Sequence, residues 1–171
     1  MPLLILFAIA CSSGASDDPA RPAASVRAGL TAATVTRVVD GDTIRVEIDG
    51  KEYRVRYIGI DTPETVDPRR PVQCFGKETS ERNRQLVEGQ VVGLEKDVSE
   101  TDSFDRLLRY VWVGDEMVNA TLVEGGYALA STYPPDVKHA DLFAALQAQA
   151  REAQRGLWGA VCAGDAPTPA G

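Results

Sequence analysis

The sequence has no excess of positive charge. Its 171 residues include 18 lysines and arginines against 25 aspartates and glutamates, which gives a formal net charge of −7 at pH 7. Proteins that bind nucleic acid through phosphate contacts usually carry a basic surface, so this composition argues against a broad basic face. Any attraction for an anionic partner would have to come from a local cluster of arginines, while the overall charge mainly governs solubility.

The N-terminal apolar run, residues 3–10, is too short to cross a bilayer as a helix. It ends in Ala-Ile-Ala before Cys11, which resembles a bacterial lipoprotein signal in which Cys11 becomes the lipidated N-terminus. No Lys or Arg precedes the run, whereas an export signal normally begins with positive charge, so the true start codon stays open. We expect residues 1–11 to direct export, either as a cell-envelope lipoprotein, with membrane contact through the lipid alone, or as a freely secreted protein.

Cysteine is scarce. The chain has three, and only Cys74 and Cys162 remain once Cys11 is assigned to the signal. Export makes a disulfide chemically permissible, because such bonds persist in oxidising compartments. Two cysteines allow one pairing, so we expect a bridge between Cys74 and Cys162. The alternative is that the two are separate, small buried residues.

Two segments have a composition that does not favour folding. Residues 12–31 and 163–171 are rich in Ser, Ala, Asp, Pro and Gly, and such segments bury too little apolar surface to offset their chain entropy. We therefore predict a disordered linker and a disordered tail around one domain, residues 32–162. A domain of this size can build its own core, and we expect it to be a monomer.

Hydrophobic periodicity predicts five strands and three helices. Alternation of polar and apolar residues marks strands at 33–39, 43–48, 51–60, 90–94 and 107–113. Helical spacing marks helices at 76–88, 117–124 and 140–153. Asp49-Gly50 is a strong two-residue hairpin signal between the second and third strands. This order indicates a small β-barrel with added helices, an α+β arrangement.

Acidic side chains follow two of the alternating segments, in the runs VDGDT and IDTPET. Together the runs offer three carboxylates: Asp42, Asp61 and Glu64. Such acid-rich turns are common, because Asp-Gly and Thr-Pro form turns readily. However, hard cations such as Ca²⁺ prefer these oxygen ligands, and Arg56 and Arg106 add guanidinium groups that can bind a phosphate in bidentate fashion. Carboxylates for a cation together with arginines for a phosphate indicate a phosphodiesterase.

Six stretches of the chain, in order, resemble the staphylococcal nuclease (thermonuclease) family. They cover residues 35–158, most of the chain, and read VVDGDTIRV, RVRYIGIDTPET, CFGKETSE, TDSFDRLLRYVW, EMVNATLVEGGYA and QAQAREAQRGLW. The resemblance implies an OB-fold, a five-stranded Greek-key barrel, with about three helices. It also implies a Ca²⁺-dependent endonuclease that acts on DNA and RNA with little sequence preference. The metal ligands it implies are the carboxylates of Asp42 and Asp61 and the backbone carbonyl of Thr62.

The same resemblance assigns the chemistry to three side chains. Glu64 would position or deprotonate the attacking water, and the two arginines, Arg56 and Arg106, would bind the phosphate most tightly in the transition state. Arg56 and Asp61 are five residues apart and would face opposite sides of a regular strand. We therefore expect the strand to bend between them, at Gly59, because glycines inside strands often mark bulges.

The substrate cleft departs from the family pattern. Phe104 and Asp105 precede Arg106, where the family often has an aromatic residue and a glycine, and Ser103 occupies a position where a lysine would help to bind phosphate. Of the segment 131–133, only Tyr133 keeps an aromatic ring that could stack on a base. Because each stacked base contributes roughly 1–3 kcal/mol, we expect weaker binding with the chemical step unchanged.

Two other functions remain as alternatives at this point. A non-catalytic OB-type binding module would keep the barrel but would be expected to lose the acids or arginines, all five of which are present here. An enzyme acting on a different phosphodiester would keep them. The residues leave open whether DNA or RNA is preferred and whether cleavage is internal or from an end.

Overall fold

The computed structural model describes residues 26–65 and 73–164. The predicted signal with Cys11, and most of the predicted linker and tail, lie outside these residues. Five strands form a barrel: β1 (Thr31–Val38), β2 (Thr43–Ile48), β3 (Lys51–Tyr57), β5 (Val91–Glu95) and β6 (Leu107–Val113). They pair in the order β3-β2-β1-β5-β6, and a parallel pairing of β3 with β6 closes the barrel. This confirms the predicted five-stranded OB-fold.

The core follows from the alternation seen in the sequence. One face of each strand points into the barrel, and the residues there are fully buried, among them Val35, Ile44, Val46, Val55 and Val111. β-branched side chains of this kind pack well on a pleated surface. The type of each predicted strand and helix is confirmed, and the ends differ by at most three residues.

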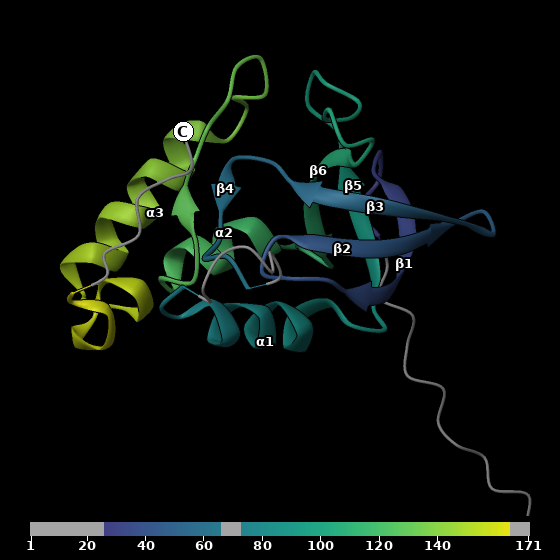
Figure 1. The fold of residues 1–171 in the computed structure, drawn as a ribbon. Helices are drawn as coiled ribbons and strands as arrows, with labels where there is room; N and C mark the ends of the chain where they lie inside the picture. Colours follow the sequence, from purple (N-terminus) through teal and green to yellow (C-terminus); the bar gives the residue numbers. More distant parts are fainter. Residues whose placement is uncertain (1–25, 66–72, 165–171) are drawn as a thin grey trace, which may run out of the picture.

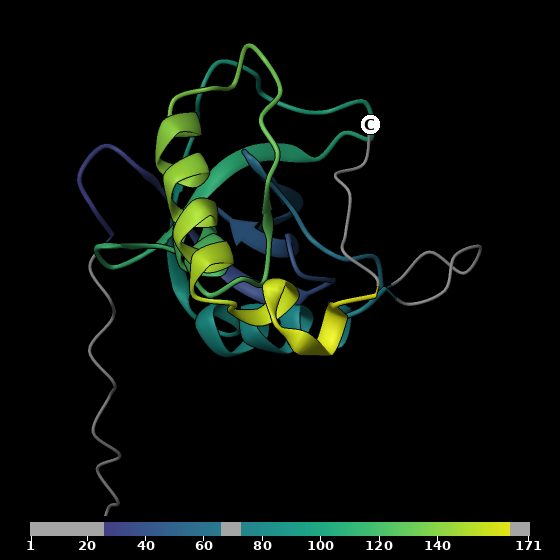
Figure 2. The same ribbon diagram turned by 90° about the vertical axis from the view of Figure 1, so that its left-hand side faces the viewer.

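Three helices surround the barrel, and Figure 1 shows α1 (Gly76–Val87) below it and α3 (Ala140–Glu152) to its left. The short helix α2 (Val118–Glu124) packs between β6 and α3. Beside the barrel, β4 (Ile60–Asp61) pairs with β8 (Leu129–Ala130), and β7 (Glu116–Met117) pairs antiparallel with β6. Two single 3₁₀ turns, η1 (Gly156–Trp158) and η2 (Ala160–Cys162), follow α3 and lie against the α1 side of the molecule (Figure 2). None of the helices within residues 26–65 and 73–164 is long and apolar enough to cross a membrane.

The described residues include the end of the predicted linker. β1 starts at Thr31, and Leu30 N–H donates a hydrogen bond to the Arg27 carbonyl. The Arg27 guanidinium lies over the Trp112 ring at 4.2 Å from its centroid, a cation–π contact. Residues 26–31, at the end of the predicted linker, therefore pack on the barrel.

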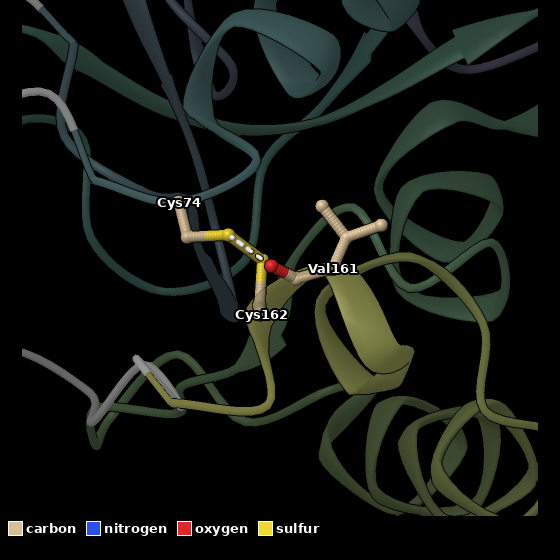
Figure 3. Close-up of a disulfide and its surroundings, with 3 residues drawn as sticks. All are labelled: Cys74, Val161 and Cys162. Carbon is tan, nitrogen blue, oxygen red and sulfur yellow. Dashed lines mark hydrogen bonds between the residues drawn. A yellow bond between two sulfur atoms is a disulfide. The ribbon is translucent and has the colours of Figure 1, made fainter.

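The predicted disulfide is confirmed. Cys74, just before α1, is bonded to Cys162 in η2 (Figure 3), and their Cα atoms are 5.9 Å apart, within the usual range for a bridge. The bridge ties the start of the first helix to the last turn of the described chain.

Candidate active site

The third predicted strand is interrupted where the sequence required a bend. β3 ends at Tyr57 and β4 begins at Ile60, and between them Gly59 has φ +76°, a conformation that favours glycine. Asn119 stabilises the break from inside: its Nδ2 donates to the Ile58 carbonyl at 2.9 Å, and its Oδ1 accepts from Val111 N–H at 2.9 Å. The chain therefore changes direction between Arg56 and Asp61, and both side chains reach one site.

Arg56 lies between two of the predicted metal ligands. One terminal nitrogen is 2.8 Å from Asp42 Oδ2, and the other is 3.0 Å from Asp61 Oδ1. The first nitrogen also donates to the carbonyls of Tyr57 at 3.2 Å and Ile60 at 3.1 Å. With these four acceptors the guanidinium is held in one orientation, and a planar fork held in this way can present its remaining N–H groups to an anion.

The turn between β1 and β2 holds Asp42 in place. The Asp40 side chain accepts a hydrogen bond from Asp42 N–H at 3.0 Å, a contact typical of aspartate in a turn. The buried Asn83 of α1 binds the same turn, since its Nδ2 donates to the Asp40 carbonyl at 3.0 Å, and its Oδ1 accepts from Tyr57 Oη at 2.9 Å. A Cβ at Gly41 would lie 2.7 Å from Thr62 Oγ1, so glycine allows the two acidic runs to approach closely.

Asp42 is the most deeply buried acid of the site, with 5% of its surface exposed. Thr62 donates to its Oδ2 from both the backbone N–H, at 3.0 Å, and the hydroxyl, at 2.8 Å. Burial raises the pKa of the Asp42 carboxyl to about 6, and the neighbouring Asp40 charge adds to the rise, although Arg56 and the Thr62 hydrogen bonds oppose it. Burial therefore outweighs the compensation that the surrounding protein groups provide.

Glu64 belongs to the same pocket as these acids. The pocket has a volume of about 120 Å³, and its polar lining includes Asp40, Asp42, Asp61, Thr62, Glu64, Arg56 and Arg106. Thr65 N–H donates to Glu64 Oε1 at 2.9 Å. The structure thus brings together every acid and arginine that the sequence assigned to the chemistry.

Arg106 reaches the pocket from the segment between β5 and β6, where Asp102 orients it. Asp102 Oδ2 accepts from Arg106 Nε at 2.6 Å, and Oδ1 accepts the backbone N–H groups of Phe104 at 2.9 Å and Arg106 at 3.0 Å. Desolvation acts to raise the pKa of Asp102, but the hydrogen bonds from Arg106 and Phe104 outweigh it and hold the pKa below its usual range. Asp105 adopts a positive φ of 58°, which aspartate tolerates better than most residues.

A larger groove of about 620 Å³ adjoins the pocket and shares Arg56, Asp61 and Arg106 with it. Two exposed aromatic rings line this groove: Phe104 is 67% exposed and Tyr133 is 58% exposed. The Arg106 guanidinium lies 5.4 Å from the centroid of the Phe104 ring. Large exposed aromatics beside arginines suit a ligand that has both flat rings and negative charge.

The oxygens of the pocket suit a hard cation in their chemistry. Asp42 and Asp61 offer carboxylates, and Thr62, in the same lining, can add its backbone carbonyl. The raised pKa of Asp42 indicates that this carboxylate would gain from further positive charge. In the described part of the chain, however, no three His, Cys, Asp or Glu side chains are grouped closely enough to hold a metal by themselves. The site therefore fits a Ca²⁺ ion only if oxygens from outside the protein complete its coordination.

The sequence patterns did not single out two side chains of this region, Gln73 and Asp102. Gln73 Oε1 accepts a hydrogen bond from Glu64 N–H at 2.8 Å. Asp102 lies in the family-like run TDSFDRLLRYVW, four residues before Arg106, but no role was assigned to it there. The side chain of Thr62 was also missed, because only its carbonyl was expected to take part.

Comparison with known proteins agrees with this geometry. Residues 54–160 match the family described as "Staphylococcal nuclease homologue". The chain is 46% identical to "Thermonuclease" of Staphylococcus intermedius over 124 residues, which are 72% of this chain and 74% of that protein. It is 45% identical to "Thermonuclease" of Staphylococcus hyicus over 124 residues, 72% of this chain and 73% of the relative. It is also 39% identical to "Endonuclease YncB" of Bacillus subtilis (strain 168) over 131 residues, 75% of this chain and 62% of the relative.

Proposed function

Because the chain belongs to the staphylococcal nuclease family and is a nuclease, we propose that it is a Ca²⁺-dependent phosphodiesterase that cleaves DNA and RNA with little sequence preference. The observation that carries the proposal is the convergence of Arg56, Arg106 and Glu64 with Asp42 and Asp61 around one small polar pocket. The binding module considered above needs no such arrangement, and relatives named as nucleases argue against it.

The two arginines bind the substrate phosphate. Arg56 is pre-oriented by Asp42 and Asp61, and Arg106 by Asp102. Pre-oriented donors lose little freedom in the reaction, so they stabilise the negative charge that grows on the phosphoryl oxygens in the transition state. The guanidinium fork matches two phosphate oxygens at once, which a lysine cannot do.

Glu64 acts on the attacking water, either by holding it in position or by taking its proton. Asp42, Asp61 and the Thr62 carbonyl would hold the Ca²⁺ ion. Once bound, the ion would supply positive charge against the phosphate and lower the repulsion between the substrate and the acidic pocket. Because so few ligands come from the protein, we expect modest affinity for Ca²⁺, with tighter binding when substrate is present.

The groove suits a substrate with flat bases, and it offers little means of selecting among those bases. Phe104 and Tyr133 offer ring faces beside the phosphate-binding arginines. Stacking accepts any base, because every base has a π-face, whereas sequence readout needs hydrogen bonds to base edges. We propose that cleavage is internal, because one of the relatives is named as an endonuclease.

We propose further that the domain at residues 32–162 works outside the cytoplasm. The Cys74–Cys162 bridge supports this, since disulfides persist mainly in oxidising compartments. The apolar run before Cys11 supports export as a lipoprotein or a secreted protein. All proposed site residues come from one chain, so we propose that the monomer is active.

The test is digestion of single-stranded DNA, duplex DNA and RNA by the purified protein with Ca²⁺, with Mg²⁺, and with a chelator. We expect cleavage of all three in Ca²⁺, weak cleavage in Mg²⁺, which demands tighter octahedral geometry, and none with chelator. Glu64→Gln should abolish most of the activity, while Glu116→Gln, at an exposed acid of β7, should leave it unchanged. Full activity in chelator would exclude the metal assignment.

A further inference from the structure

Gln73 holds the backbone of Glu64 from both sides. Its side-chain Oε1 accepts a hydrogen bond from Glu64 N–H at 2.8 Å, and its own N–H donates to the Glu64 carbonyl at 3.0 Å. Both backbone polar groups of Glu64 are therefore bonded to one residue nine positions further along the chain. The Glu64 carboxylate accepts from Thr65 N–H at 2.9 Å, which ties it to the backbone next to the residue that Gln73 holds.

The disulfide fixes Gln73 in turn. Gln73 precedes Cys74, and its carbonyl accepts from Gly76 N–H at 3.1 Å, at the start of α1. Cys162, on the other side of the bridge, is only 2% exposed, and the Val161 carbonyl oxygen lies 3.5 Å from Cys74 Sγ (Figure 3). The exposed Gln73 is thus linked, through Cys74 and the disulfide, to the buried Cys162.

The backbone next to the bridge needs such an attachment. Phe75 has a φ of 67°, which is unfavourable for a bulky residue. Its ring packs against Tyr127, with the ring centroids 5.5 Å apart. Residues persist in such conformations only where their surroundings hold them. Without the bridge, we expect residues 73–75 to be held less firmly in this conformation.

We propose that Gln73 is a positioning residue for Glu64 and that the Cys74–Cys162 bridge keeps Gln73 in place. The inference rests on the proposed role of Glu64 in orienting or deprotonating water. Loss of the Gln73 contact would lower the fraction of molecules in which the carboxylate points at the water, and small misplacements of a catalytic group have large kinetic effects. The arginines that bind the phosphate are held by other residues, so substrate binding would stay the same.

The first experiment replaces the side chain at position 73. Gln73→Met keeps the length of the side chain but removes the acceptor. We expect kcat to fall about three- to tenfold, because the loss of one ordinary hydrogen bond can change the fraction of correctly positioned Glu64 by that amount. KM should stay within about twofold. Gln73→Glu keeps an acceptor oxygen at the same length and should restore most of kcat. Gln85→Met, at an exposed position of α1, is the matched control and should resemble the parent protein.

A double-mutant cycle with Glu64→Gln separates this inference from the proposed function. If Gln73 acts through Glu64, Gln73→Met should have no further effect on kcat once Glu64 is replaced. An equal loss of kcat in both backgrounds would overturn the inference and leave the role of Glu64 standing. Parent-like kcat in a folded Glu64→Gln variant would overturn both.

The bridge is tested by Cys74→Ala/Cys162→Ala, assayed well below its melting temperature. We expect kcat to fall at least as much as in Gln73→Met, with KM again nearly constant, and little additional loss when Gln73→Met is added. Parent-like kcat in this variant would refute the part played by the bridge. If the variant does not fold, the cycle at Gln73 and Glu64 still decides the positioning role.

Discussion

The shape of the site depends directly on the absence of a Cβ at Gly59. Its φ of +76° is unfavourable for any residue with a Cβ, at about 1–2 kcal/mol. In addition, a Cβ at this position would lie 2.5 Å from Phe143 Cε2 and 2.8 Å from Cδ2. The Phe143 ring is fully buried, and overpacking of this kind typically costs about 1–3 kcal/mol. We therefore expect Gly59→Ala to lower the free energy of unfolding by about 2–5 kcal/mol.

Gly50 provides a matched control for the backbone contribution. It has nearly the same φ, +77°, in the hairpin between β2 and β3, but a Cβ added there would have no other atom within 4 Å. Gly50→Ala should therefore show the conformational cost alone, about 1–2 kcal/mol. The difference between the two variants, measured by urea denaturation, isolates the contact with Phe143.

Activity gives a second measurement on the same variants. Gly59 sets the bend that lets Arg56 and Asp61 meet, so kcat/KM should fall in Gly59→Ala but stay unchanged in Gly50→Ala. Gly59→Ala combined with Phe143→Leu should be more stable than the sum of the two single changes predicts, because the shorter side chain leaves room for the new methyl group. Equal destabilisation at positions 59 and 50, or strict additivity with Phe143→Leu, would refute the packing argument.

Three further outcomes are expected. Glu64→Gln should keep the fold and Ca²⁺ binding but lower turnover by about two or more orders of magnitude, the scale of a general base. Single-turnover cleavage and calorimetric Ca²⁺ titration measure these two properties. Near-parental turnover would contradict the prediction. Asp102→Asn keeps an oxygen for the two backbone N–H groups but loses the ion pair with Arg106, so kcat/KM should fall about tenfold. Folding lowers the pKa of Asp102, so its stabilising contribution is present above the unfolded pKa of about 3.9 and is lost as pH falls through the folded value. The difference in free energy of unfolding between the parent protein and Asp102→Asn should therefore shrink in acid. A difference that grew in acid would contradict the assignment. Removing the Cys74–Cys162 bridge frees a loop with a sequence separation of 88 residues, which the chain-entropy model equates with about 4–5 kcal/mol of stability; an unchanged urea midpoint would contradict it.

Local patterns predicted the small barrel with its helices and the two acidic runs, whereas the OB-fold and the roles of the site residues came from the family resemblance. Alternating residues give the strands, Asp49-Gly50 gives the hairpin, and the odd spacing of Arg56 and Asp61 requires a bend that a nearby glycine can supply. These signals lie within a few residues of the features they predict, so one sequence is enough to find them.

The supporting contacts were not predictable for the opposite reason. Arg27 packs on Trp112, which is distant in sequence, and the composition of residues 26–31 gave no sign of this contact. Gln73 bonds to the backbone of Glu64, and any side chain with an acceptor could do so. Contacts of these kinds depend on which segments the completed fold brings together, and they leave no periodic or compositional trace.

The disulfide also determines whether the two fragments of a proteolytically nicked chain stay joined. The segment that it closes contains Arg106 and the exposed Phe104, while Asp42, Asp61 and Glu64 precede it. An exposed tip such as the one at Phe104 is a preferred site of proteolytic nicking. A single cut there would leave two pieces joined through sulfur, with the acidic half of the site and Arg106 on opposite sides of the cut. The nicked protein would migrate as one species without reductant and would separate into two fragments only after reduction.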